Sequence, residues 1–415
     1  MLSQILDQVF RRESGRVLAG LIRRLGDFDL AEDALQDACA KALEAWSRDE
    51  LPDNPGAWLA AVAQRRGVDV LRRRKPTQPL PDVPARDDEP DPVTPATSVG
   101  DDRLRLLFTC CHPALGHTAQ IALALRTLGG LTTREIARAF LEPEPTTAQR
   151  LVRVKQKIRE AAIPYEIPGK ADLPERFTAV LEVVYLIFNE GYAATDAAGL
   201  LRPDLCTEAI RLARLVVELL PDEPEARGLL ALVLLTDARR AARVGPDGEP
   251  VPLEEQDRTV WDRAAITEGT AVLDAALLYR RPGPYQIQAA IAALHGAAPT
   301  ADRTDWFQIT GLYAALLRQT PTPVVELNAA VAVAMTGQLQ SGLDWIASLE
   351  NRGLLIDYYL LPAAKAELLR RASRLAEAAG AYERALELAR NPAERGYLQR
   401  RLREVSGSDD TMTLK

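Results

Sequence analysis

The sequence predicts an all-α protein, and three observations support this prediction. Ala, Leu, Arg and Glu, which favour helices, dominate the composition. Runs in which strand-forming residues alternate with polar ones are scarce, whereas apolar residues recur at helical spacing along most of the chain. A chain of 415 residues, 47% of them hydrophobic, is long enough for about two to four globular domains.

Two proline-rich passages divide the chain. Residues 76–100 hold seven prolines, five acids and no aromatic residue, so they cannot bury enough apolar surface to fold and predict an extended acidic linker. Residues 163–174 form a second, shorter passage of this kind. The sequence therefore predicts helical blocks at 1–75, 101–163 and 175–415.

The segment 29–46 predicts an amphipathic helix. Asp33, Gln36 and Asp37 project away from its apolar side. That side is made of Ala31, Ala34, Leu35, Ala38, Ala42 and Leu43. The acidic face either binds a partner or is simply solvated, and charge runs are more often solvated.

The segment 54–75 predicts a helix that Pro55 and Trp58 open and that ends in positive charge. A single acid, Asp69, stands among its basic residues. These are Arg65, Arg66, Arg72, Arg73, Arg74 and Lys75. Such a helix end suits contacts with phosphates, but arginines also complement the dipole at a helix C-terminus, and the sequence leaves both interpretations open.

The segment 131–160 predicts a helix-turn-helix. Thr132 and Glu135 have the spacing of a capping box, and the turn LEPEP at 141–145 follows the first helix. Thr146 is the expected cap of the second helix, whose Leu151, Val154 and Ile158 should face inward. Its outer faces carry Gln149, Arg150, Arg153, Lys155, Gln156 and Lys157, and Thr147 is expected to face a partner together with Gln149, Arg150 and Arg153.

This second helix holds five basic residues against the single Glu160, although the whole chain has a formal net charge of −7. Clustered positive charge on the second helix of such a motif is typical of a helix that enters the major groove of DNA. Two packed helices with a solvated basic face are the alternative.

From Glu175 onward the chain predicts helix after helix, interrupted by a polar break at 245–252. In the segment 363–391, small residues and large ones follow each other at helical spacing, as in tetratricopeptide (TPR) helices. The small ones are Ala376, Ala379 and Ala385, and the large ones are Tyr382, Leu386 and Leu388. The repeat period is irregular, so the prediction is a TPR-like array.

Polar and aromatic residues are mixed in this array. Hydrogen bonding between repeats is the favoured interpretation of them, and a groove for a ligand or a protein partner is the alternative. They are Asp257, Arg258, Trp261, Tyr285, Gln286, Gln288, His295, Trp306 and Asn328.

The sequence predicts no catalytic residue, metal site or cofactor. Phosphate-loop, dinucleotide, metalloprotease and nucleophile-elbow motifs are not found. Cys110, Cys111 and His112 do not have the spacing of a zinc site, and burial in a helix is the favoured interpretation. Four cysteines, no secretory signal and no long apolar run lead us to expect a cytoplasmic protein away from membranes.

The order of these motifs resembles an extracytoplasmic-function sigma factor of bacterial RNA polymerase over residues 1–163. The segment DLAEDALQDACAKALEAW resembles region 2.2, NPGAWLAAVAQRRGVDVLRRRK resembles regions 2.3 and 2.4, and LTTREIARAFLEPEPTTAQRLVRVKQKIR resembles region 4.2. The resemblance implies core RNA polymerase as a partner, through its beta-prime clamp helices and its beta flap, and promoter DNA as a second partner.

The resemblance also implies roles for individual residues. Asp33, Gln36 and Asp37 would bind the clamp. The −10 element would be met by Trp58, Arg65, Arg66, Asp69 and Arg72. The −35 element would be met by Thr147, Gln149, Arg150, Arg153 and Lys157. Arg65 stands where the family usually has Asn.

The rest of the chain resembles the subgroup of these factors with a TPR-like C-terminal extension. FTCCHPAL, VVYLIFNEGY, QDRTVWDR, GPYQIQAAIAALHG, TPVVELNAAVAVA and NPAERGYLQRRL carry this resemblance, with Ala329 where the extension usually has Arg. We therefore expect a non-enzymatic sigma factor regulated by its own extension, on which a protein partner could bind. A helix-turn-helix regulator that acts without replacing sigma, and a scaffold built on the repeats, are the alternatives.

Overall fold

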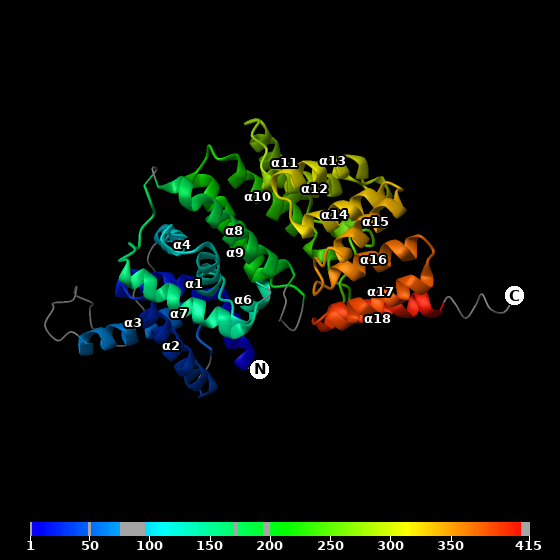
Figure 1. Cartoon of the computed structure of the whole chain (residues 1–415). Coiled ribbons are helices and arrows are strands. Elements are labelled where there is room, and N and C mark those ends of the chain that lie inside the picture. Colours follow the sequence, from blue (N-terminus) through cyan, green and yellow to red (C-terminus); the bar gives the residue numbers. More distant parts are fainter. Residues whose placement is uncertain are drawn as a thin grey trace. The chain divides into compact units, whose positions relative to one another are not determined.

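The computed structural model describes residues 2–48, 51–74, 96–140, 142–169, 172–193 and 200–407. Within these ranges the regular structure is helical, apart from an isolated bridge between Val244 and Pro250, so the all-α prediction is confirmed. The chain forms two compact units, Met1–Ile187 and Phe188–Lys415. Figure 1 shows the helices of both.

The first unit begins with three helices that pack on one another, α1 (Leu2–Leu25), α2 (Phe28–Arg48) and α3 (Pro55–Arg74). Four alanines of α2 are at most 1% exposed, so its neighbours approach its backbone closely. They are Ala31, Ala34, Ala38 and Ala42. Leu43, expected on this apolar side, is 44% exposed, because the buried stripe continues from Ala42 to Trp46 and a residue next to Ala42 is turned by about 100°.

The same unit continues with α4 (Ala96–Cys110), α5 (His117–Thr127), α6 (Thr133–Ala139), α7 (Glu144–Glu160) and most of α8 (Leu173–Tyr192). Helix α4 packs against α1, and an ion pair of 3.1 Å joins Arg23 of α1 to Asp102 of α4. The acidic linker was expected over 76–100. Its last residues, 96–100, belong to α4, and the rest lies outside the described residues.

The connection before α8 is bound to the first unit. The Tyr165 hydroxyl lies 2.9 Å from the carbonyl oxygens of both Ala19 and Asp102, and the Thr109 hydroxyl donates to the Pro164 carbonyl. Ile163 and Pro168 are buried. The proline-rich passage that was expected to separate two domains therefore packs on the first of them.

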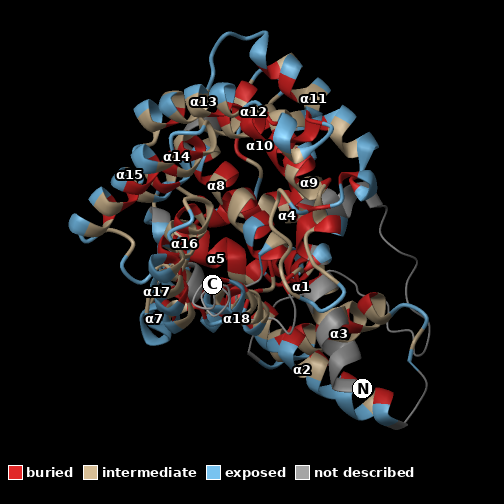
Figure 2. Cartoon of the chain, turned by 90° about the vertical axis from the view of Figure 1, so that its right-hand side faces the viewer, coloured by how far each residue is buried: buried red, intermediate tan, exposed pale blue. Residues whose placement is uncertain are grey.

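The second unit is a succession of helices in which each packs against the next in the chain (Figure 1). Such nearest-neighbour packing is typical of helical-repeat proteins. The helices are α9 (Pro203–Leu219), α10 (Pro224–Asp237), α11 (Arg263–Leu277), α12 (Pro284–Ala297), α13 (Trp306–Gln319), α14 (Pro323–Met335), α15 (Leu339–Asn351), α16 (Leu360–Arg371), α17 (Leu375–Leu388) and α18 (Pro392–Gly407). Figure 2 shows α10 as largely buried, and this helix also packs against α12.

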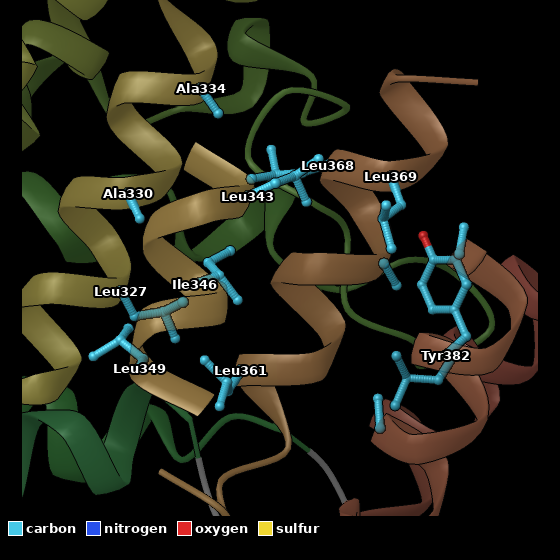
Figure 3. Packing of buried hydrophobic residues seen from close by; sticks show 14 of the residues in the cluster. Leu327, Ala330, Ala334, Leu343, Ile346, Leu349, Leu361, Leu368, Leu369 and Tyr382 are labelled. Carbon is cyan, nitrogen blue, oxygen red and sulfur yellow. The ribbon is translucent and has the colours of Figure 1, made fainter. Parts of the chain in front are cut away.

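The pair α16 and α17 shows how the array is packed. Tyr382 of α17 is 1% exposed, reaches toward Leu369 of α16 and donates its hydroxyl to Glu367 over 3.2 Å (Figure 3). Ala385 is buried as expected, but Ala376 is exposed and Ala378 is buried in its place. Ala378 precedes Tyr382 by four residues and so lies on the same face.

The polar break at 245–252 is confirmed, but it is held in place. Gly248 adopts φ +83°, which suits a glycine at a turn, and Val244 bridges Pro250. Three ion pairs then hold residues 249–255, at the end of this break and just after it, against α16 and α18. They join Glu249 to Arg400 (3.0 Å), Glu254 to Arg371 and Glu255 to Arg401.

Much of the polar and aromatic set in the array is structural. Arg258 is buried, donates to the His295 and Ala298 carbonyls over 2.7 Å each, and lies over the Trp261 ring. His295 meets Trp306 edge to face at 5.3 Å. These contacts support the favoured interpretation, whereas Asn328 lines a cavity. In the described part of the chain, no helix is long and apolar enough to cross a membrane.

The buried His295 predicts a stability that depends on pH. Burial, with Arg239 and Arg258 nearby, lowers the pKa of His295 from 6.5 to about 4. The unfolded chain therefore binds a proton at higher pH than the folded one, so stability falls as the pH drops from 6.5 toward 4 and the loss stops below that. From pH 7 to pH 4.5 we expect the wild type to lose about 2 to 3 kcal/mol more than His295→Phe, measured by urea unfolding. Equal losses would contradict a buried neutral imidazole.

Candidate nucleic-acid interface

The acidic face of α2 is accessible. Asp33 and Gln36 are exposed, while Asp37 is half-exposed and pairs with Nε of Arg66 on α3 at 2.5 Å. The helix starts where the Asp27 carboxylate accepts a hydrogen bond from the Leu30 amide. Two residues expected to meet different partners, Asp37 and Arg66, are therefore partners of each other in this structure.

Helix α3 presents four of the five predicted −10 residues on one side, and the fifth, Arg66, is turned toward Asp37 of α2. Trp58, Arg65, Asp69 and Arg72 are spaced at 7, 4 and 3 residues, which keeps them within about 60° of one another around the helix. The three polar ones are exposed. Trp58 is half-buried, and its ring lies 5.4 Å from that of Trp46, so its indole also joins α3 to α2.

The first helix of the helix-turn-helix begins with the predicted capping box. The Thr132 amide and hydroxyl both donate to the Glu135 carboxylate, over 2.7 and 2.9 Å, and the Glu135 amide donates to the Thr132 hydroxyl over 3.2 Å. This reciprocal bonding satisfies amides that would otherwise lack partners at the helix start. The capping box is therefore confirmed.

The second helix begins earlier than predicted. Its N-cap is Pro143, so Thr146 lies inside the first turn and does not cap the helix. Pro145 explains this start, because its fixed φ and missing amide hydrogen suit the first turn of a helix. Leu151, Val154 and Ile158 are buried as predicted.

Thr147 was expected to face a partner, and the structure places it differently. It is fully buried, and its hydroxyl donates to the Glu142 carboxylate. The helical geometry explains this, because Thr147 lies about 160° around α7 from Gln149. Thr147 therefore positions the turn and presents no group to a partner.

Glu142 also holds Arg150. The guanidinium makes two hydrogen bonds to this carboxylate, one of them 2.6 Å long, and lies over the Phe140 ring at 5.6 Å. The hydrogen bond from Arg150 is the main cause that lowers the pKa of Glu142, which therefore stays ionised. Arg150 is thus held rigidly at the start of α7.

A shallow basic groove lies between α5 and α7. Gln149, Arg153 and Lys157 are exposed along one side of α7, and Arg150 joins them in lining a hollow of about 250 Å³. Gly116 and Ala119, at the start of α5, form part of the other wall. A polar, positively charged surface of this kind can hold phosphates and reach base edges.

The opposite side of α7 contacts α2. Lys155 pairs with Asp29 at 3.0 Å and with Glu32 at 2.7 Å, and Arg159 also pairs with Asp29. In the sequence, neither Asp29 nor Glu32 stands out as a residue that binds another helix. With Arg150 bound to Glu142, three of the five basic residues of α7 are therefore paired inside the first unit, which leaves the charges of Arg153 and Lys157 available on the groove side.

The cysteines at the end of α4 are structural. Cys110 and Cys111 are at most 1% exposed, and burial raises the pKa of the Cys110 thiol to about 12. A protonated, buried thiol is a poor metal ligand and nucleophile. Among the residues that the structure describes, no group of three or more His, Cys, Asp or Glu side chains could hold a metal ion.

Comparison with known proteins shows the family to which the chain belongs. An uncharacterized protein, R00370, of Rhizobium meliloti (strain 1021) is 43% identical over 403 residues, which are 96% of this chain and 95% of that protein. The chain belongs to the family of this protein. Residues 176–277 match a family of unknown function (DUF6596). No solved structure matches the chain.

Residues 9–77 of this family member match sigma-70 region 2. The match covers α2 and α3 completely and most of α1, and it therefore includes the acidic face of α2 and the basic face of α3. A sigma-70 region 2 domain indicates a sigma-factor-like role in RNA polymerase binding and transcription. It is the domain of a non-enzymatic initiation factor.

Proposed function

We propose that the chain is an extracytoplasmic-function sigma factor, which binds core RNA polymerase and directs promoter-specific initiation. The match of residues 9–77 to sigma-70 region 2 carries this proposal. The basic helix-turn-helix at 131–160, in the same compact unit, supports it as region 4.2. The protein does no chemistry of its own, and its effect comes from where it positions the polymerase.

In this proposal α2 is the polymerase-binding helix. Asp33 and Gln36 are exposed and can reach the beta-prime clamp helices directly. Asp37 is already paired with Arg66, so its carboxylate must either exchange this partner or contribute through the oxygen that Arg66 leaves open. Asp33 is therefore the residue whose removal tests the interface most cleanly.

The two DNA contacts follow from the exposed sides of α3 and α7. Arg65 and Arg72 contact the −10 element. Trp58 and Asp69 lie beside them on the same side of α3, and Arg66 lies at the edge of this side. Gln149, Arg153 and Lys157 meet the −35 element, and Arg150 is held there by Glu142. Residues early in such a helix reach base edges, whereas later ones reach phosphates.

We also propose that the extension regulates the factor in cis and is TPR-like. The second unit, Phe188–Lys415, is more than half of the chain and has its own core. An array of stacked helices offers an extended surface to partners. The proposal is independent of the promoter contacts, so it needs its own test.

One prediction of the proposed function concerns the binding of core RNA polymerase. Asp33→Lys should weaken binding to core RNA polymerase about tenfold, on the order of 1.4 kcal/mol, because a positive charge replaces a negative one at the interface. Co-elution of full-length protein with core polymerase measures this. Asp53→Lys is the matched control, since Asp53 is also exposed but lies between the two helices. Equal binding by both variants would exclude α2 as the interface and favour a regulator that acts without replacing sigma.

A second prediction concerns the −35 element. Arg150→Ala should cost about 1–3 kcal/mol at preferred sites and relax selectivity at one base position, because Arg150 is held early in α7. Lys157→Ala should weaken all sequences alike and reduce the salt dependence by about one ion. Selection from a randomised −35 library by the reconstituted holoenzyme measures both. Uniform losses in the two variants would mean that α7 does not enter the groove in this orientation.

The third prediction concerns the extension. A chain that ends at Ala193, and so keeps α8 whole, should transcribe several-fold more or several-fold less than the full-length protein with the same core polymerase. Multi-round transcription on a selected promoter measures this, and circular dichroism checks that the shortened chain stays helical. Equal transcription by two folded proteins would end the proposal of regulation in cis.

A further inference from the structure

The second unit contains a cavity of about 480 Å³. Its walls come from α14, α16, α17 and α18, from the end of α8, and from the segment 250–256, which ion pairs hold against α16 and α18. Small-molecule sites in proteins have volumes of about 300–1,000 Å³. The cavity therefore has the size of a metabolite site, and residues far apart in the sequence form it.

Two arginines in this cavity pair with no carboxylate of the described residues. Arg239 and Arg243, four residues apart, line it, and among the described residues neither makes an ion pair. Nε of Arg239 is buried and makes no hydrogen bond. Arg243 donates to the Tyr192 carbonyl over 2.9 Å and lies 4.4 Å from the Tyr192 ring. Both arginines are only partly exposed, and a partly buried guanidinium without a counter-ion is unfavourable, so an anionic ligand would explain this arrangement.

The acids on the opposite wall have other partners. Glu367 binds Arg370 and Arg371 and accepts the Tyr382 hydroxyl. Glu394 accepts the Tyr359 hydroxyl over 2.6 Å. Within the described residues, Glu367 pairs with arginines of its own helix and no ion pair involves Arg239 or Arg243, so the two guanidinium groups remain available to an anion that enters the cavity.

A third polar side chain in this cavity indicates what else a bound molecule would carry besides an anionic group. Gln256, which also lines the cavity, is only 7% exposed. Its Nε2 donates to the Val251 carbonyl over 3.0 Å, but its Oε1 has no partner. Buried acceptors are nearly always bonded, so Oε1 calls for a donor such as a hydroxyl or an amine. Leu327, Val331 and Leu398 supply an apolar wall.

We propose that this cavity binds a small organic anion, a carboxylate or a phosphate, that carries a hydrogen-bond donor on an apolar body. Arg239 and Arg243 hold the anionic group, Gln256 accepts from the donor, and the leucines and Val331 cover the apolar part. This site goes beyond the proposed role in transcription. It is tested on the protein alone, so its failure would leave that role unaffected.

A binding experiment tests the chemistry. The probes are 4-hydroxyphenylacetate and 4-hydroxyphenyl phosphate, with neutral 4-hydroxyphenylacetamide and inorganic phosphate as comparisons. Calorimetry with the full-length protein at millimolar probe should show saturable binding of at least one aromatic anion, at least tenfold tighter than the amide. Binding of inorganic phosphate alone would mean an anion site without the proposed organic body. No binding of either aromatic anion would overturn the proposal.

Variants test the residues. Arg239→Met should weaken the bound anion at least tenfold, because the charge that holds it is lost. Arg240→Met is the matched control, since Arg240 pairs with Asp237 and does not line the cavity. Anion binding that Arg239→Met leaves unchanged would overturn the proposal.

A measurement without ligand separates binding from structure. If Arg239 is kept for a ligand, the empty site carries an uncompensated charge, and Arg239→Met should raise the melting temperature of the ligand-free protein by several degrees. Arg240→Met, which removes an ion pair, should leave it unchanged or lower it. A fall in melting temperature for Arg239→Met would assign Arg239 to packing and contradict a ligand site.

Discussion

Close approach between helices is the constraint on which both units depend. The described chain has no sheet to join distant segments, so helices must interlock through their side chains, and small residues decide where their backbones can meet. A Cβ atom at Gly15 of α1 would lie 2.6 Å from the Leu128 carbonyl oxygen, and one at Gly228 of α10 would lie 2.7 Å from the Gln286 amide nitrogen of α12. The alanine stripe of α2 does the same between α1 and α3. The positions of the surfaces proposed for polymerase and DNA follow from these contacts.

Features set by neighbours in the sequence could be predicted. The capping box of Thr132 and Glu135 is local, because both groups lie within one helical turn, and the inward side of α7 follows from its period. The predictions were wrong where the position of a side chain depends on residues outside its own helical turn. Thr146 was expected to cap α7, but two prolines start the helix earlier. Thr147 was expected to face a partner, but only the helix start and Glu142 show that it points inward.

Features that join distant segments could not be predicted. Lys155 and Glu32 are 123 residues apart. Nothing in the sequence around Glu32 indicates that its carboxylate pairs with a lysine of another helix. The cavity of the second unit combines residues from Tyr192 to Leu398, and the polar break beside it read as an interruption of the array. Arg239 looked like one more arginine at a helix end. What distinguishes Arg239 is that, among the described residues, no carboxylate pairs with it, and this can be seen only in the three-dimensional structure.

The ion pairs between α2 and α7 have a consequence for work on DNA. Elements named −10 and −35 lie some 25 base pairs apart, or about 85 Å along the duplex at 3.4 Å per pair. Helices α3 and α7 cannot span that distance while Lys155 and Arg159 hold α7 against α2. The exposed pair of Arg159 with Asp29 contributes at most about 1 kcal/mol and is weakened by salt, and the partly buried pairs of Lys155 are screened less. Breaking these ion pairs therefore costs less free energy at higher ionic strength. The contacts between the protein and DNA phosphates also become weaker at higher ionic strength. The two effects oppose each other, so a factor built in this way would bind its promoter with a flatter response to salt than its arginines and lysines alone would give.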